Sequence, residues 1–131
     1  MTGDPELAKV LARLSERAHH EIDLPYLVNG WQRFVERVQT GYDWTIYDYT
    51  NDLGKRNLLA EVIAAVSPAS AHALEDLIRE ADAAYRAATR EVEQPILPQP
   101  ARTHRWWWFR IPRVLTDEMR DDFRHLRLIG D

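Results

Sequence analysis

The most constraining feature of this 131-residue sequence is a helix start signal that occurs three times. A polar residue is followed within two positions by proline at Asp4-Pro5, Asp23-Leu24-Pro25 and Ser67-Pro68. The polar side chain can accept a hydrogen bond from the first helical turn, where proline has no amide hydrogen to lose. Apolar residues then recur three and four positions apart, which is typical of a helix with one buried face. The sequence therefore predicts helices over about residues 4–20 and 23–40 and a third helix that begins at Ser67. In the third helix, Asp82 and Arg86 are four residues apart, which predicts an ion pair on its exposed side.

Residues 42–53 fit two patterns. With a period of two, large apolar residues at positions 42, 44 and 46 alternate with polar ones, as in a strand. With a period of 3.6, apolar residues at positions 42, 46, 49 and 53 share one face of a helix. We favour the helix because its pattern continues after the alternation has failed. Gly54 is expected to break or kink it before a short helix over residues 58–66.

Proline excludes a helix near the C-terminus. Residues 94–100 are Gln-Pro-Ile-Leu-Pro-Gln-Pro, which favours extended, polyproline-like chain. We therefore predict that residues 94–113 form an extended tether and an aromatic latch. Thr116, followed by two acidic residues, indicates the start of a last helix over residues 116–127. The predicted fold is all-α: a single helical domain over residues 1–131, a small bundle of five to six helices with an extended Pro- and Trp-rich C-terminal segment.

Composition limits the chemistry and the compartment. The chain has no cysteine, which excludes disulfides, thiol nucleophiles and cysteine-ligated metals. Its longest apolar stretch, residues 58–66, is interrupted by Glu61 and is too short to span a membrane. No secretion signal is visible, so we expect a cytoplasmic protein with no membrane partner. The formal net charge is −4, yet residues 101–131 carry seven basic and five acidic side chains, which gives an acidic body and a basic tail.

Two polar clusters are candidates for chemistry, and local roles account for both. His19 and Asp23 could hold a metal, but a histidine at the end of a helix is favoured by the helix dipole without being a ligand. In the polar run 48–56, Asn51 or Asp52 can cap a following helix, and Asp52 can pair with Arg56 four residues later. The sequence therefore predicts no catalytic residue, no metal site and no cofactor.

The most distinctive segment is Arg-Trp-Trp-Trp-Phe-Arg-Ile-Pro-Arg at residues 105–113, which we call the aromatic–arginine segment. In an extended chain, Trp107 and Phe109 point to one side, and Trp106 and Trp108 point to the other. One row can pack on the helices, while the other is either covered as part of the core or exposed for a partner. Tryptophan and arginine are also the residue types that dominate interface hot spots. The candidate binding residues are Arg105, Trp106, Trp108, Arg110 and Arg113.

One stretch resembles a known group of proteins. Residues 49–53, Tyr-Thr-Asn-Asp-Leu, are followed by Arg56, by Leu58-Leu59 and by Glu61-Val62. This pattern is similar to small helical proteins of uncharacterised function from actinobacteria. No activity attaches to the resemblance, so it implies a helical fold and assigns no catalytic residue.

These features favour a non-enzymatic protein–protein interaction module. It would dock a partner or its own copy through the aromatic–arginine segment. One alternative is an immunity protein or antitoxin-type inhibitor that masks a basic partner with its acidic surface. Another is single-stranded nucleic-acid binding, with tryptophan stacking beside Arg102, Arg105, Arg110 and Arg113.

A truncation tests whether the C-terminal segment belongs to the fold. A loose segment with Trp106 to Phe109 would promote aggregation, so we expect it to lie fixed against the helices. Burying one such aromatic side chain contributes roughly 2–3 kcal/mol. Ending the chain at Glu93 should therefore unfold or precipitate the protein, as measured by circular dichroism and light scattering. A soluble 1–93 fragment that melts cooperatively near the full-length temperature would contradict this prediction.

Overall fold

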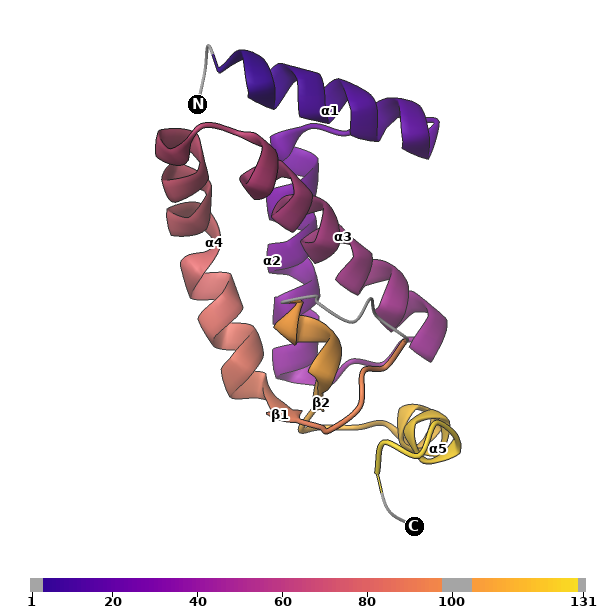
Figure 1. Cartoon of the computed structure of the whole chain (residues 1–131). Coiled ribbons are helices and arrows are strands. Elements are labelled where there is room, and N and C mark those ends of the chain that lie inside the picture. Colours follow the sequence, from indigo (N-terminus) through magenta and orange to yellow (C-terminus); the bar gives the residue numbers. More distant parts are fainter. Residues whose placement is uncertain (1–3, 98–104, 130–131) are drawn as a thin grey trace.

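The computed structural model describes residues 4–97 and 105–129 of the chain. Within these residues the protein is mostly helical, which confirms the all-α prediction at that level (Figure 1). Four long helices come first and are followed by a short strand, a 3₁₀ helix, a second strand and a last helix. Their bounds are α1 Pro5–Ala18, α2 Leu24–Thr40, α3 Ile46–Ala65, α4 Pro68–Ala88, β1 Thr89–Glu91, η1 Trp106–Phe109, β2 Arg110–Pro112 and α5 Asp117–His125.

The helix start signals lie where the sequence predicted them. The side chains of Asp4, Asp23, Ser67 and Thr116 each accept a hydrogen bond from a backbone amide in the first turn of the helix that follows. The predicted ends are less accurate. The first helix ends at Ala18 because His19 adopts a left-handed conformation, and α5 ends at His125 instead of residue 127.

Residues 42–53 are helical from Ile46 onward, which confirms the preferred pattern in part. Thr45 caps α3 through a reciprocal capping box with Asp48, so neither Asn51 nor Asp52 is a cap. The predicted break at Gly54 is wrong, since α3 continues through it to Ala65. The helix tolerates this glycine because its buried face continues on both sides of it, at Tyr49, Leu53, Leu59 and Val62.

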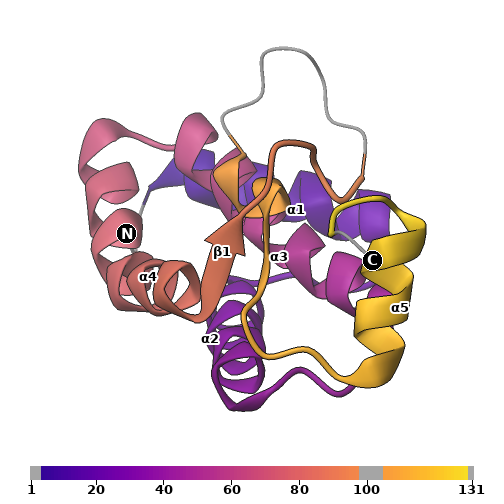
Figure 2. The same cartoon turned by 90° about the horizontal axis from the view of Figure 1, so that it is seen from below.

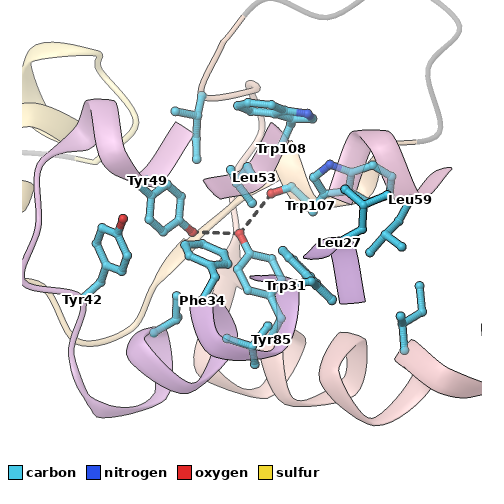
Figure 3. Packing of buried hydrophobic residues seen from close by; sticks show 14 of the residues in the cluster. Leu27, Trp31, Phe34, Tyr42, Tyr49, Leu53, Leu59, Tyr85, Trp107 and Trp108 are labelled. Atoms are coloured by element: carbon cyan, nitrogen blue, oxygen red, sulfur yellow. Dashed lines mark hydrogen bonds between the residues drawn. The ribbon is translucent and has the colours of Figure 1, made fainter. Parts of the chain in front are cut away.

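Helix α2 is the central element of the bundle. It packs against both α3 and α4, while α1 lies across one end of this group and contacts α3 (Figure 1). An aromatic cluster fills the space between these helices (Figure 3). The Phe34 ring lies at its middle, with its centroid 5.5 Å from that of Tyr42, 5.2 Å from that of Tyr49 and 5.9 Å from that of Tyr85. Such edge-on and tilted contacts add to the burial of apolar surface and fix the rings relative to one another.

The C-terminal segment is more structured than an extended tether. Among the described residues 94–97 and 105–113, only β2 forms a strand; it pairs antiparallel with β1, which places Arg90 opposite Ile111. Residues 106–109 form the 3₁₀ helix η1, so the predicted two-sided alternation is wrong. A 3₁₀ helix has about three residues per turn, and both Trp107 and Trp108 face the interior with only 3% of their surface exposed. Residues 98–104, including Arg102, lie outside the described part of the chain.

From η1 through β2, the chain runs across the bundle to α5 (Figure 2). On the way η1 contacts α3, and α5 lies beside the beginning of α3. The rings of Phe123 and Tyr49 meet there, with their centroids 6.0 Å apart. Met119 and Phe123 are fully buried, so α5 contributes to the same core as the four long helices.

Candidate functional site

The arginines of the aromatic–arginine segment bind the end of α4. The Arg110 guanidinium donates hydrogen bonds to the Thr89 hydroxyl at 2.8 Å and to the carbonyls of Arg86 and Thr89, both at 3.1 Å. The Arg113 guanidinium donates to the Ala87 carbonyl at 3.1 Å. The last carbonyls of a helix lack partners within the helix and carry its negative dipole end, so two cations there are stabilising.

The tryptophans of the same segment differ in exposure. Trp107 and Trp108 both donate their indole N–H to the Asn57 side-chain oxygen, at 2.7 and 2.8 Å. Trp106 is half-buried, and the Arg86 guanidinium lies 3.9 Å from its ring centroid. Arg105 is half-buried at the start of η1. The structure thus binds Trp108, Arg110 and Arg113 into the fold through their own polar groups and does not gather the five predicted binding residues on one surface.

Beneath η1 lies an ion pair that joins α3 to α4. Arg56 donates to both carboxylate oxygens of Asp82 at 3.0 Å, and the Trp31 indole donates to the same carboxylate at 2.9 Å. The Arg56 guanidinium also lies 4.3 Å from the Trp107 ring centroid. The predicted local pairs, Asp52 with Arg56 and Asp82 with Arg86, are therefore wrong. Arg56 and Asp82 instead pair with each other across two helices, which spacing along one helix cannot reveal.

A tyrosine network lies against Trp31, whose ring centroid is 5.2 Å from that of Tyr85 (Figure 3). The hydroxyls of Tyr49 and Tyr85 share a hydrogen bond of 2.8 Å, and the Tyr85 hydroxyl donates to the Trp107 carbonyl at 3.1 Å. Tyr42 donates to the Asp52 carboxylate at 2.8 Å. Burial raises the pKa of all three tyrosines well above the ordinary value, so they remain neutral donors. This network holds the segment in place.

A group of exposed apolar side chains lies elsewhere, between the start of α3, residues 96–97 and α5. These segments enclose a groove of about 210 Å³, lined among others by Tyr47, Leu97 and Leu126. Tyr47 is 82% exposed, and the two leucines are each 43% exposed. Large apolar side chains gathered at one depression indicate a binding surface. The sequence did not identify this groove because its walls come from three separate segments.

The groove has an acidic rim. Asp122 and His125 line it from α5, and Glu118 lies on the same side of that helix, four residues before Asp122. Arg120 and Arg124 lie on another side of α5 and pair with acidic neighbours on their own helix. On the α3 side, Asp48 is exposed in the first turn of the helix, beside Tyr47. An apolar floor beside carboxylates suits a ligand that combines an apolar group with a positive charge.

The described residues limit the chemistry available. Within residues 4–97 and 105–129, no group of three or more His, Asp or Glu side chains is placed to hold a metal ion. In the same part of the chain, no helix combines the length and apolarity needed to span a bilayer. No protein-family model, curated protein or solved structure matches this chain.

The buried ion pair leads to a stability prediction. Arg56→Met leaves the Asp82 carboxylate, whose side chain is only 17% exposed, without its cation, so we expect the free energy of unfolding to fall by up to about 3–5 kcal/mol. The control is Arg17→Met, which removes the Arg17–Glu61 bond at a solvent-exposed site, where the loss should be about 0–1 kcal/mol. Urea denaturation followed by circular dichroism measures both. Equal losses for the two variants would show that the buried pair has no special role.

The tyrosines make stability depend on alkaline pH. A tyrosine whose pKa is raised by folding stabilises the protein below its unfolded pKa of about 10, and that contribution disappears as the pH rises further. We therefore expect the protein to unfold above about pH 10, with tyrosinate absorbance and loss of helix appearing together. Tyr42→Phe should make the dependence on pH less steep. Ionisation of Tyr42 with no change in circular dichroism would contradict this account.

Proposed function

We propose that this chain is a non-enzymatic protein-interaction module that binds a segment of another protein in the α3–α5 groove. The observation that carries the proposal is the exposure of Tyr47, Leu97 and Leu126 around one depression. An aromatic ring flanked by aliphatic side chains is the usual composition of an interface centre. A groove of about 210 Å³ can accept one large side chain of a partner.

The rim indicates which partner fits. Asp122 lines the groove from α5, Glu118 lies one helical turn before it, and Asp48 is exposed at the start of α3. A segment with an aliphatic or aromatic side chain next to lysine or arginine would complement both features. An acidic segment would bring like charges together and would be rejected.

The aromatic–arginine segment is hydrogen-bonded to the chain that forms one wall of the groove. The backbone amide of Ile96 donates to the Trp108 carbonyl at 2.9 Å, and that of Val92 donates to the Phe109 carbonyl at 2.8 Å. These bonds tie the wall that carries Leu97 to η1. We therefore assign Trp107, Trp108 and Arg110 a positioning role and place the docking surface in the groove.

The acidic rim also favours a second candidate, an inhibitor that masks a basic partner protein. Such an inhibitor would use the same groove, and the two functions differ in whether binding abolishes the partner's activity. Nucleic-acid binding is less well supported, because the indole N–H groups of Trp107 and Trp108 bind Asn57 and both rings are buried.

Selection from a random peptide library tests the groove. We expect the full-length protein to enrich peptides in which a large apolar residue stands beside lysine or arginine. Leu126→Asp should weaken the binding of these peptides by at least about tenfold. Leu77→Asp is the matched control, because Leu77 is a similarly exposed leucine on α4 and does not line the groove. Circular dichroism verifies that both variants fold.

Two outcomes would contradict the proposal. One is enrichment of acidic peptides, or binding that Leu77→Asp weakens as much as Leu126→Asp does. The other is a concentration-dependent dimer in sedimentation that Leu126→Asp abolishes, which would assign the groove to a second copy of the chain.

A further inference from the structure

A polar cleft between α2 and α3 has a composition unlike that of the groove. It encloses about 420 Å³, which is within the size range of small-molecule sites. Tyr26, Arg33 and Arg37 line it from α2, and Asp52 and Lys55 line it from α3. The α2 residues lie on one helical face because their spacing follows the helical repeat.

The cleft is locally basic in an acidic protein. Arg33, Arg37 and Lys55 face the carboxylates of Asp23 and Asp52, which leaves one positive charge in excess. Arg33 and Arg37 are four residues apart on one helix and repel each other. Within the described part of the chain, neither Arg33 nor Arg37 forms an ion pair with a carboxylate. An anion bound between them would relieve the repulsion.

Both carboxylates of the cleft already have partners in the fold. Asp23 caps α2 by accepting from the Tyr26 amide at 2.8 Å. Asp52 is buried and accepts from the Tyr42 hydroxyl at 2.8 Å and from the Lys55 ammonium at 3.4 Å. Their positions are therefore set by these bonds within the fold, and neither forms an ion pair with the two guanidinium groups.

Packing holds two of the three cations near the cleft. The Lys55 side chain crosses α2 at Gly30, where an added Cβ would lie 2.7 Å from the Lys55 Cδ. The absence of a side chain at Gly30 thus lets the Lys55 ammonium reach the cleft, 5.7 Å from the centroid of the Tyr26 ring. The Arg37 guanidinium stacks on Trp44, 4.0 Å from its ring centroid. Cations fixed in this way lose little freedom when they bind a ligand.

We propose that the α2–α3 cleft binds a small phosphate monoester. Arg33 and Arg37 hold the phosphate oxygens, and Lys55 adds a third donor. A phosphate monoester carries between one and two negative charges at neutral pH, which exceeds the single charge of a carboxylate and suits several converging cations. Guanidinium groups match its oxygens with paired hydrogen bonds. The exposed ring of Tyr26 offers a face to a planar organic group on the ester.

Titration calorimetry of the full-length protein with phenyl phosphate tests the proposal, with benzoate as the singly charged comparison. At about 0.15 M salt we expect saturable binding with a Kd below about 1 mM, and benzoate binding at least about tenfold more weakly. Arg33→Gln should weaken phenyl phosphate binding at least about tenfold. Arg13→Gln is the control, because Arg13 is an exposed arginine on α1 outside the cleft.

Gly30→Ala separates binding from folding. Alanine favours a helix over glycine, which offsets the loss of the Lys55–Asp52 contact, so the melting temperature should change little, yet the displaced Lys55 should weaken phenyl phosphate binding. The absence of saturable binding, equal affinity for benzoate, or an equal loss in Arg13→Gln would overturn the proposal. Leu126→Asp should leave phenyl phosphate binding unchanged. The proposals for the α2–α3 cleft and for the α3–α5 groove are therefore tested independently.

Discussion

The Arg56–Asp82 ion pair is the interaction on which the arrangement of this fold depends. Charges are expensive to remove from water, and a buried pair is tolerated only where its geometry is fixed and its remaining hydrogen bonds are satisfied. Here the pair is bidentate, the Trp31 indole binds the carboxylate, and the Trp107 ring covers the guanidinium. One cluster therefore connects α2, α3, α4 and η1 and fixes their positions relative to one another.

The C-terminal segment completes this arrangement and connects it to the surface. Its arginines satisfy the last carbonyls of α4, and its tryptophans meet at Asn57 of α3. The carbonyl of Trp108 then holds the chain at Ile96, which forms one wall of the α3–α5 groove. The buried ion pair and the exposed groove are thus linked through a single short stretch of chain.

What the sequence predicted and what it missed have one physical explanation. Helix starts depend on local hydrogen bonds, so the caps at Asp4, Asp23 and Ser67 were predictable. The same local reasoning paired Asp82 with Arg86 and stopped a helix at Gly54, because it could not see the packing that decides both. The groove was missed for the same reason: Tyr47, Leu97 and Leu126 are far apart in sequence and become neighbours only in the fold.

The central claim is that the aromatic–arginine segment is part of the core. The rate at which the indole N–H protons exchange with solvent tests this claim directly. The chain has five tryptophans, and their indole N–H signals can be resolved by NMR and assigned by single substitutions to phenylalanine. The N–H groups of Trp31, Trp107 and Trp108 bind Asp82 and Asn57, so in heavy water they should exchange far more slowly than that of the exposed Trp44. Exchange of Trp107 and Trp108 as fast as that of Trp44 would show that the segment is not held in the core.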